Sequence, residues 1–547
     1  MKNIPSISTL SLTLLLIFSC ASAAEAASAA DAHEHFLECL SHESMNNTYY
    51  DNDVHPTNSA SFASVLEFSI RNLRFASEST PKPQVIITPE HESQIPPVIY
   101  CARKTDTEIR VRSGGHDLEG LSYVSQNRFV IIDLINLSEI RINVEEKTAW
   151  VESGATLGSL YYRIAEKSST LAYPAGLCPT VGIGGQFSGG GEGTLLRKYG
   201  LAADNIIDAR IVDVEGRILD RKSMGEDLFW AIRGGGGASF GVIVSWKIQL
   251  VDVPEKVTVF TVNRALEQNA TQLIQRWQEV APELDRDLFI GIFFFGLSSA
   301  VTGANPTILA SFFSLFLGDV DRLLPMLEEK FPELGVTRKD CAEMSWVEST
   351  LYFAAAPIIP PPEPLPLEFL LNRTQPGLRL LKMKSDYAVK PISAEALEGL
   401  YTMMYDSEAA ESFELMLPYG GRMSEIPESA IPFPHRKAYM FKVALTVAWK
   451  DSLAQDSDKY ISWSRRYHSY MTPYVSMNPR ATYFNNRDLD IGVNNADGNT
   501  SYAQASVWGV KYFGDNFDRL VRVKGEVDPH NFFKNEQSIP PCGKKED

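Results

Sequence analysis

The sequence predicts an α+β protein with two domains, and three observations support this fold class. The chain has 547 residues, of which 44% are hydrophobic and 22% charged, a globular composition at a length that usually exceeds one core. Between Pro83 and Leu250, short β-rich runs are separated by glycine-rich turns and helical stretches. From about Val257 the glycine clusters stop, and longer helical and extended segments alternate. We therefore expect a second domain to begin there.

Six segments of the first region carry the β-branched and aromatic residues that are typical of strands. They are residues 85–88, 109–112, 129–134, 149–151, 206–212 and 242–250. In the second region the patterns predict helices over residues 265–280 and 319–331 and strands over 289–295 and 309–316. Six prolines between residues 356 and 367 bar a helix and predict an extended surface loop. This loop is either a lid or a plain connector, because prolines alone do not show what a loop contacts.

The net charge argues against two classes of partner. Acidic residues outnumber basic ones by 68 to 51, which gives a formal charge of -17. Such a surface repels the phosphates of nucleic acids and anionic membranes. We therefore expect neither a nucleic acid nor a membrane as partner.

The first 23 residues are predicted to be a secretory signal peptide. Lys2 precedes an apolar run over residues 10–18, and small residues follow at positions 21–23. We find no later stretch of about 20 apolar residues that would span a bilayer. We expect a soluble mature protein in the secretory pathway, in a vesicle derived from the endoplasmic reticulum, the vacuole or the apoplast.

Removal of the signal peptide, together with Cys20, would leave an odd number of cysteines in an oxidising compartment. The remaining five are Cys39, Cys101, Cys178, Cys341 and Cys542. At least one of them must then be unpaired. Considered alone, Cys178 is a disulfide partner or a buried apolar thiol. Glycosylation is expected at the Asn-x-Ser/Thr triplets that begin at Asn46, Asn269, Asn372 and Asn499.

Glycine clusters in the first region predict a site for a dinucleotide. They lie at residues 112–117, 182–193, 199–202 and 233–241. Glycines let backbone N–H groups converge on an anion, and several separated clusters with little nearby lysine suit the pyrophosphate of FAD or NAD. The glycine spacing does not match the Rossmann fingerprint, and no Walker P-loop motif occurs. The sequence therefore predicts a different dinucleotide-binding fold.

Three motifs resemble berberine bridge enzyme and its plant relatives, which include the cannabinoid synthases. They are RSGGHD at residues 112–117, CPTVG at 178–182 and DPHNFF at 528–533, and the resemblance extends from about Phe36 to Pro541. It implies the fold of the vanillyl alcohol oxidase superfamily. An FAD-binding domain of the PCMH type, made of residues 24–254 and a C-terminal segment 476–547, would enclose an α+β substrate-binding domain over residues 255–475.

The resemblance also implies bicovalent FAD, with His116 bonded to the flavin 8α carbon and Cys178 to flavin C6. Without that motif, His116 would be an ordinary histidine that hydrogen-bonds a turn. An imidazole nitrogen and a thiolate are good nucleophiles toward an electron-poor isoalloxazine. The same resemblance implies a Cys39–Cys101 disulfide. Further cofactor contacts are expected from Arg112, Ser113, Gly114, Gly115, Asp117, Ser122, Gly182, Gly185, Asn205, Tyr483 and Asn485. We expect no metal site and a monomer.

Val181 bears on the electron acceptor. In the family, the residue three positions after the linked cysteine resembles a gate for oxygen, and a small valine there accompanies oxidase activity. Val181 occupies that position, which implies dioxygen as acceptor and hydrogen peroxide as product. The alternative is that Val181 is simply a β-branched strand residue.

The chain departs from its relatives at the positions of their proton acceptors. Where alcohol-oxidising relatives have a tyrosine base in a motif like NYRDLD, this chain has Asn486. Glu192 replaces a second tyrosine in GGGEG, and Ala444 aligns with a glutamine or glutamate base, two residues after Lys442. An amide such as Asn486 cannot accept a proton at physiological pH.

These departures favour oxidation of a tertiary-amine alkaloid, which needs no base because the nitrogen lone pair stabilises the product iminium. Glu192 could stabilise the developing charge, or act as a base with a pKa raised by burial. It could also be solvated or simply paired with Lys442. The rival function is a carbohydrate oxidase or an alcohol oxidase of the monolignol type. A non-catalytic sugar-binding protein would need a broken flavin site, and His116 and Cys178 argue against it.

Overall fold

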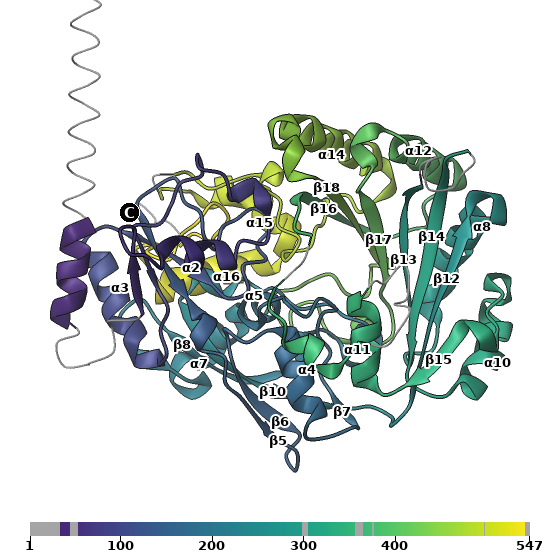
Figure 1. Cartoon of the computed structure of the whole chain (residues 1–547), viewed down its shortest axis with the longest axis horizontal. Coiled ribbons are helices and arrows are strands. Elements are labelled where there is room, and N and C mark those ends of the chain that lie inside the picture. The colour runs from purple at the N-terminus through teal and green to yellow at the C-terminus, as the bar shows by residue number, and fades with distance from the viewer. Residues whose placement is uncertain are drawn as a thin grey trace, which may run out of the picture.

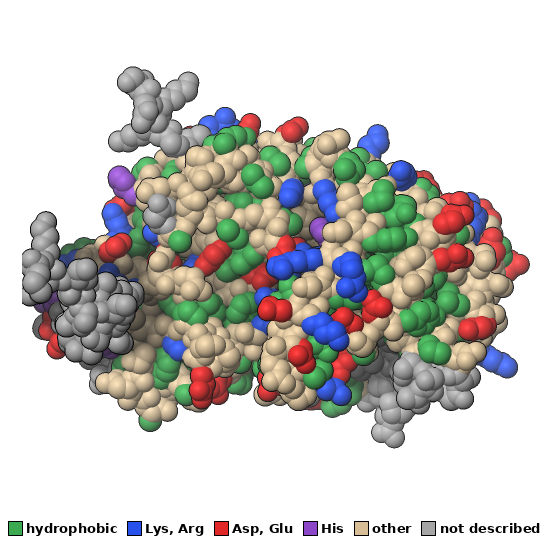
Figure 2. Space-filling model, turned by 90° about the horizontal axis from the view of Figure 1, so that it is seen from above, with side chains coloured by type: hydrophobic (Ala, Val, Ile, Leu, Met, Phe, Trp, Pro, Cys, Tyr) green, Lys and Arg blue, Asp and Glu red, His purple; other side chains and the backbone are tan. Residues whose placement is uncertain are grey.

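The computed structural model describes residues 33–43, 53–297, 305–355, 365–374, 377–496 and 498–541. Several predictions fall outside these residues: the signal peptide, the Asn46 glycosylation site, and the proline-rich loop between residues 356 and 364. Within the described ranges, no helix is long and apolar enough to cross a membrane. The face shown in Figure 2 carries basic and acidic side chains side by side.

The N-terminal part lies in the lower left of Figure 1 and contains two main sheets. The first has the order β1 (Val54–Pro56), β2 (Val85–Ile87), β4 (Phe129–Asp133), β3 (Glu108–Arg112). The second has the order β5 (Ile140–Asn143), β6 (Thr148–Glu152), β10 (Val242–Gln249), β8 (Ile206–Val212), β9 (Ile218–Leu219). A short pair joins β11 (Val251–Asp252) to β7 (Leu171–Ala172). The described α-helices of this part are one over residues 33–43, α2 (Phe62–Phe68), α3 (Ile95–Lys104), α4 (Leu157–Ala165), α5 (Ile183–Ser188), α6 (Leu196–Tyr199) and α7 (Arg221–Ile232).

A seven-stranded antiparallel sheet dominates the other half of the molecule. Its order is β15 (Cys341–Met344), β12 (Val257–Ala265), β14 (Thr307–Phe316), β13 (Leu288–Leu297), β17 (Phe413–Pro418), β18 (Phe441–Trp449), β16 (Leu380–Ala388). Figure 1 shows α8 (Ala270–Val280), α12 (Ala394–Met404) and α14 (Ser457–Met471) on its outer side. The remaining helices are α10 (Val320–Lys330), α11 (Trp346–Ala355) and α13 (Arg422–Glu425). The inner face of the sheet is turned toward the N-terminal part and packs into one core with it.

The C-terminal segment returns to the N-terminal part. It carries α15 (Tyr502–Phe513) and α16 (Asn516–Val527), which lie beside the N-terminal elements in Figure 1. The buried Lys524 ammonium donates to the Ser239 carbonyl at 2.6 Å. The Asn485 amide donates to the Gln186 carbonyl at 2.9 Å. The predicted fold class is thus confirmed, since both chain ends build one half of the molecule around a separate α+β half.

All six strands predicted in the first region are present. One helix of the second region starts later than predicted, at Ala270 instead of residue 265. Residues 257–265 instead form β12, which pairs with β14 along its length. Asn269 then adopts a left-handed conformation with a φ of 64°, and the helix begins after it. Its side chain is exposed, as are those of Asn372 and Asn499, the other described glycosylation candidates.

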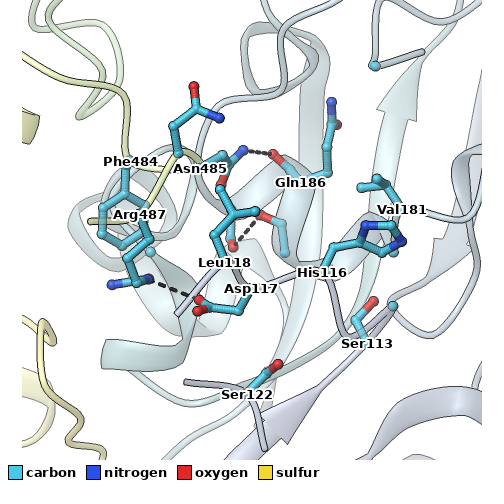
Figure 3. A pocket seen from close by; sticks show the side chains of 18 of the residues that line it. Ser113, His116, Asp117, Leu118, Ser122, Val181, Gln186, Phe484, Asn485 and Arg487 are labelled. Carbon is cyan, nitrogen blue, oxygen red and sulfur yellow. Dashed lines mark hydrogen bonds and ion pairs between the residues drawn. The ribbon is translucent and has the colours of Figure 1, made fainter. Parts of the chain in front are cut away.

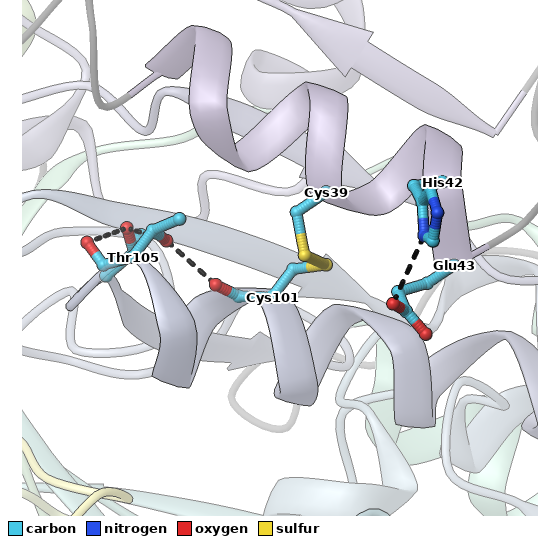
Figure 4. Close-up of a disulfide and its surroundings, with 6 residues drawn as sticks. Cys39, His42, Glu43, Cys101 and Thr105 are labelled. Carbon is cyan, nitrogen blue, oxygen red and sulfur yellow. Dashed lines mark hydrogen bonds and ion pairs between the residues drawn. A yellow bond between two sulfur atoms is a disulfide. The ribbon is translucent and has the colours of Figure 1, made fainter.

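The predicted Cys39–Cys101 disulfide is confirmed. It joins the helix over residues 33–43 to α3 with a Cα–Cα distance of 5.7 Å (Figure 4). Among the described cysteines, Cys178 and Cys341 are free.

Candidate active site

A cavity of about 490 Å³ lies where the N-terminal part, the large sheet and the C-terminal segment meet. Its lining comes from the loops after β3, from residues 176–194, from 236–243, from β16, β17 and β18, and from residues 483–487. Figure 3 shows labelled side chains from three distant segments, residues 113–122, 181–186 and 484–487, around one space. The cavity therefore forms only when both chain ends and the sheet are assembled.

Two glycine loops interlock at the floor of the cavity. A Cβ atom at Gly114 would lie 2.3 Å from the Gly182 backbone nitrogen, so no larger residue fits there. Gly115 has a φ of 71°, a backbone conformation that residues other than glycine rarely adopt. The two predicted loops thus contact each other directly through their backbones.

His116 and Cys178 approach the same hydroxyl group. The His116 Nε2 atom lies 3.0 Å from Thr180 Oγ1, and the Cys178 sulfur lies 3.4 Å from that oxygen. Burial, with a smaller contribution from the Arg71 charge, lowers the pKa of His116 to about 3. The imidazole is therefore neutral at physiological pH and keeps a lone pair on one ring nitrogen. Cys178 is solvent-exposed within the cavity lining.

Four lining residues carry buried polar atoms without a hydrogen-bond partner in the described part of the chain. They are Arg110 Nε, Ser122 Oγ, Gln186 Oε1 and Arg487 Nη1. Unpartnered buried polar groups are rare in folded proteins, and such groups in a cavity indicate atoms that a ligand can bind. One hydroxyl, two guanidinium donors and one amide oxygen that accepts, together with the glycine backbones, fit the polar groups of a dinucleotide such as FAD. These residues would hold the cofactor.

Most of the predicted cofactor contacts line the cavity. The exceptions are the side chains of Arg112 and Asn205. Arg112 is fully buried against Asp133 at 2.7 Å and donates to two carbonyls of α2. Asn205 donates to the carbonyls of Tyr199 and Leu201, each at 2.9 Å. Both side chains are thus engaged by other parts of the chain and do not line the cavity. Those that do line it are Ser113, Gly114, Gly115, His116, Asp117, Ser122, Cys178, Gly182, Gly185, Tyr483 and Asn485.

Glu192 and Lys442 form a buried ion pair at one side of the cavity. Their side chains are 5% and 4% exposed, so the expectation that Glu192 could be solvated is wrong, and pairing with Lys442 is what the structure shows. The second carboxylate oxygen of Glu192 accepts a hydrogen bond from Tyr419. Burial and the Glu192 charge raise the pKa of Tyr419 well above its ordinary value, so this hydroxyl stays protonated as a donor.

The neighbours of Lys442 complete this charged corner. Its ammonium lies 3.2 Å from Asn486 Oδ1 and 4.5 Å from the centre of the Tyr483 ring. The Tyr483 hydroxyl accepts a hydrogen bond from the Gly191 amide at 2.9 Å. Asn486 and Val181, which were predicted as catalytic positions, both line the cavity. Ala444 is buried in β18 opposite Leu415 and offers no proton acceptor.

The large sheet gives the cavity an apolar wall. It consists of Phe289 on β13, Met383 on β16, and Leu415 and Leu417 on β17. Alternation along β17 turns these two leucines toward the cavity and Glu414 and Met416 toward the outer core. The wall offers contact area for hydrocarbon and aromatic surface, and its Met383 sulfur accepts a hydrogen bond from the Asn486 side-chain amide at 2.8 Å.

Sequence reasoning missed Tyr419, Arg487 and the apolar wall. Leu415 and Leu417 have the two-residue spacing of a strand face, which could have indicated the wall. Arg487 directly follows Asn486, a predicted catalytic position, and this adjacency could have indicated that Arg487 lines the cavity. Tyr419 contacts Glu192 across 227 positions, and no local pattern indicates such a contact.

Comparison with known proteins identifies the family. A model described as FAD binding domain matches residues 83–221, and one described as berberine and berberine like matches residues 482–540. A tetrahydroberberine oxidase of Berberis wilsoniae is 49% identical over 93% of this chain and 94% of its own length. The solved structure of BBE-like 28 from Arabidopsis thaliana has a TM-score of 0.86 and 45% identity, and covers 93% of this chain and 100% of its own. Phl p 4, a grass pollen allergen with glucose dehydrogenase activity, has a TM-score of 0.86 and 43% identity with the same coverage of both chains. The chain therefore belongs to the berberine bridge enzyme-like family of FAD-binding oxidoreductases.

Proposed function

We propose that this oxidoreductase removes a hydride from a tertiary-amine alkaloid and passes the electrons through bicovalent FAD to dioxygen. The observation that carries the proposal is the composition of the cavity. It combines an apolar wall with one buried carboxylate and has no tyrosine at position 486. The overall reaction converts amine, dioxygen and a proton to iminium and hydrogen peroxide.

His116 and Cys178 are proposed to hold the flavin at its 8α and C6 positions. The neutral His116 imidazole supports this, because its lone pair can attack an electron-poor carbon. The exposed thiol of Cys178 beside Thr180 supports the second bond. Bound FAD supplies the hydride acceptor. The protein's own contribution is to orient substrate against it and to exclude water.

Amine oxidation suits the groups that this cavity offers. Asn486 cannot take a proton, and the Asn486 and Glu192 oxygens are already engaged by the Lys442 ammonium. A tertiary amine needs no base, since its lone pair stabilises the cation that forms when the hydride leaves. The Glu192 carboxylate then offsets the charge of Lys442 and keeps that cation from being repelled. The tetrahydroberberine oxidase relative is named for a tertiary-amine alkaloid, which also supports this substrate class.

Val181 is proposed as the oxygen gate. Val181 directly follows Thr180 and lines the cavity. Its backbone N–H donates to the Cys178 carbonyl at 3.2 Å. A small side chain at this position leaves room for dioxygen.

The paired Cys39 and Cys101 support a place in an oxidising compartment of the secretory pathway.

Two measurements on the purified enzyme test the proposal. Acid precipitation should leave yellow flavin in the protein pellet, and release of all FAD would exclude covalent attachment. Hydrogen peroxide release should then be measured with panels of alkaloids, monolignols and sugars. Tertiary amines should be the fastest substrates. Rapid peroxide release with sugars or simple alcohols, with amines inert, would instead establish the carbohydrate or alcohol oxidase that the Phl p 4 relative suggests.

A further inference from the structure

The loop that presents His116 is tied to the C-terminal segment by two separate ionic bridges. The first joins Asp117, the residue after His116, to Arg487 with a distance of 3.0 Å between Oδ2 and Nε (Figure 3). The second runs from Glu119 through Lys382 to Asp488. Both bridges connect residues 117–119, which follow His116, with residues 487–488 of the C-terminal segment. They therefore fix the position of these two segments relative to each other.

Asp117 divides its carboxylate between two tasks. Oδ1 accepts the backbone N–H groups of Glu119 and Leu121 at 3.0 and 3.1 Å, which holds the turn after His116. Oδ2 accepts from Arg487. The turn therefore keeps its internal shape through one oxygen and takes its position in the molecule through the other.

The second bridge is buried and strongly charged. The Lys382 and Asp488 side chains are 3% and 2% exposed, and their N–O distance is 2.7 Å. The Glu119 carboxylate, which is 4% exposed, forms a second ion pair with the Lys382 ammonium. Lys384 binds the second oxygen of Asp488, also at 2.7 Å. Separating a buried charge such as the Asp488 carboxylate from its partners is unfavourable. Asp488, the residue after Arg487, is therefore held rigidly.

Arg487 itself is held in place and still has a free donor. Its guanidinium lies 4.4 Å from the centre of the Phe484 ring. Its Nη1 atom is buried, lines the cavity and has no partner among the described residues. The side chain thus connects the His116 loop, the C-terminal segment and the space that the cofactor would occupy.

Cys178 is anchored by a different part of the molecule. Helix α4 fixes its loop, because the backbone N–H groups of Leu157 and Gly158 donate to the carbonyls of Val181 and Pro179, each at 2.9 Å. The two attachment residues therefore have different anchors, although their loops contact each other at Thr180 and through the backbones of Gly114 and Gly182.

We propose that Arg487, through Asp117, is a positioning residue for formation of the bond between His116 and the flavin, and not for the bond to Cys178. This inference rests on the proposed bicovalent attachment. In that step a His116 ring nitrogen bonds to the flavin 8α carbon. One hydrogen leaves the ring nitrogen and one leaves the 8α methyl group, and these two protons and two electrons convert dioxygen to hydrogen peroxide. A displacement of the reacting atoms by about 1 Å can slow such a step about a hundredfold.

The test compares the two linkages within one protein. Arg487→Met removes the first bridge, and Asp117→Asn weakens it while leaving an oxygen for the two backbone contacts. Arg465→Met is the matched control, because Arg465 is 57% exposed and pairs with Asp490 at 2.6 Å at the surface end of the same segment. Each full-length protein is denatured and digested, and mass spectrometry gives the flavinylated fraction of the His116 and Cys178 peptides. Arg487→Lys tests rescue by a conservative change.

We expect Arg487→Met and Asp117→Asn to lower the fraction of His116-linked flavin at least tenfold, with Cys178-linked flavin retained. The control should match wild type, and Arg487→Lys should recover part of the histidyl linkage. Retained Cys178 linkage shows that the variant folds and binds FAD. Should Arg487→Met fail to fold, Asp117→Asn decides alone. Unchanged histidyl linkage, or equal loss of both linkages, would overturn the inference. A wild-type protein without histidyl flavin would refute the proposed attachment instead.

Discussion

The Glu192–Lys442 pair gives the sharpest prediction about catalysis. Glu192→Gln removes the negative partner and leaves the Lys442 ammonium uncompensated at the cavity wall. Flavin reduction by a tertiary amine develops positive charge on the substrate. For two positive charges about 6 Å apart at an effective dielectric constant of about 20, the repulsion is about 3 kcal/mol. That barrier corresponds to flavin reduction about a hundredfold slower.

A double-variant cycle separates the possible roles of Glu192. Glu192→Gln combined with Lys442→Met restores a neutral corner of similar volume. We expect flavin reduction in the double variant to return to within about threefold of wild type, because no net charge then opposes the iminium. The assay is anaerobic stopped-flow reduction of the bound flavin at saturating amine.

The outcomes of this cycle are distinct. If Glu192 acted as a base, the double variant would be as slow as Glu192→Gln alone. If the pair were a spectator, neither variant would change the rate. Either result would refute the reasoning that the pair works by charge compensation.

Three further predictions concern other parts of the chain. Val181→Leu should slow reoxidation of the reduced flavin in air without slowing its reduction, and equal reoxidation rates would remove the proposed gate. Cys39→Ser opens a cross-link between positions 62 residues apart, so the free energy of unfolding should fall by about 4 kcal/mol in denaturant titrations. An unchanged denaturation midpoint would show that the disulfide adds nothing. Burial raises the pKa of Glu414 from 4.5 to about 8, so between these values the folded state keeps a proton that the unfolded state has released. The free energy of unfolding should therefore fall with rising pH in this window by up to about 1.4 kcal/mol per unit, and Glu414→Gln should abolish that slope. Parallel stability curves for Glu414→Gln and wild type would contradict it.

The sequence was most informative where local chemistry determines structure. The short strands of the N-terminal part were predictable because β-branched runs alternate there with glycine turns. The strands β16, β17 and β18 were not predicted, although they carry Met383, Leu415 and Lys442. β18 is buried over its whole length, and two of the four residues between its large apolar ones are alanines, so its alternation of polar and apolar residues is weaker than in a half-exposed strand.

The candidate site was predictable only in part, for a similar reason. Its motif residues could be recognised from the chain alone, and pairing of Glu192 with Lys442 was one of the alternatives considered. The contacts that decide among those alternatives join positions far apart. Tyr419 and Arg487 acquire their roles only when the large sheet and the C-terminal segment close on the glycine loops.

The return of the C-terminal segment also has a consequence for biosynthesis. Tyr483 binds the Gly191 amide across 292 positions. At about 5 to 20 residues per second, the ribosome needs roughly 15 to 60 s to make the intervening chain. During that interval the C-terminal side of the cavity around the glycine loops has not been synthesised, so the cavity cannot enclose FAD. In the oxidising compartment proposed above, the Cys178 thiol would be open to mispairing with Cys39 or Cys101 until the C-terminal segment has been translated.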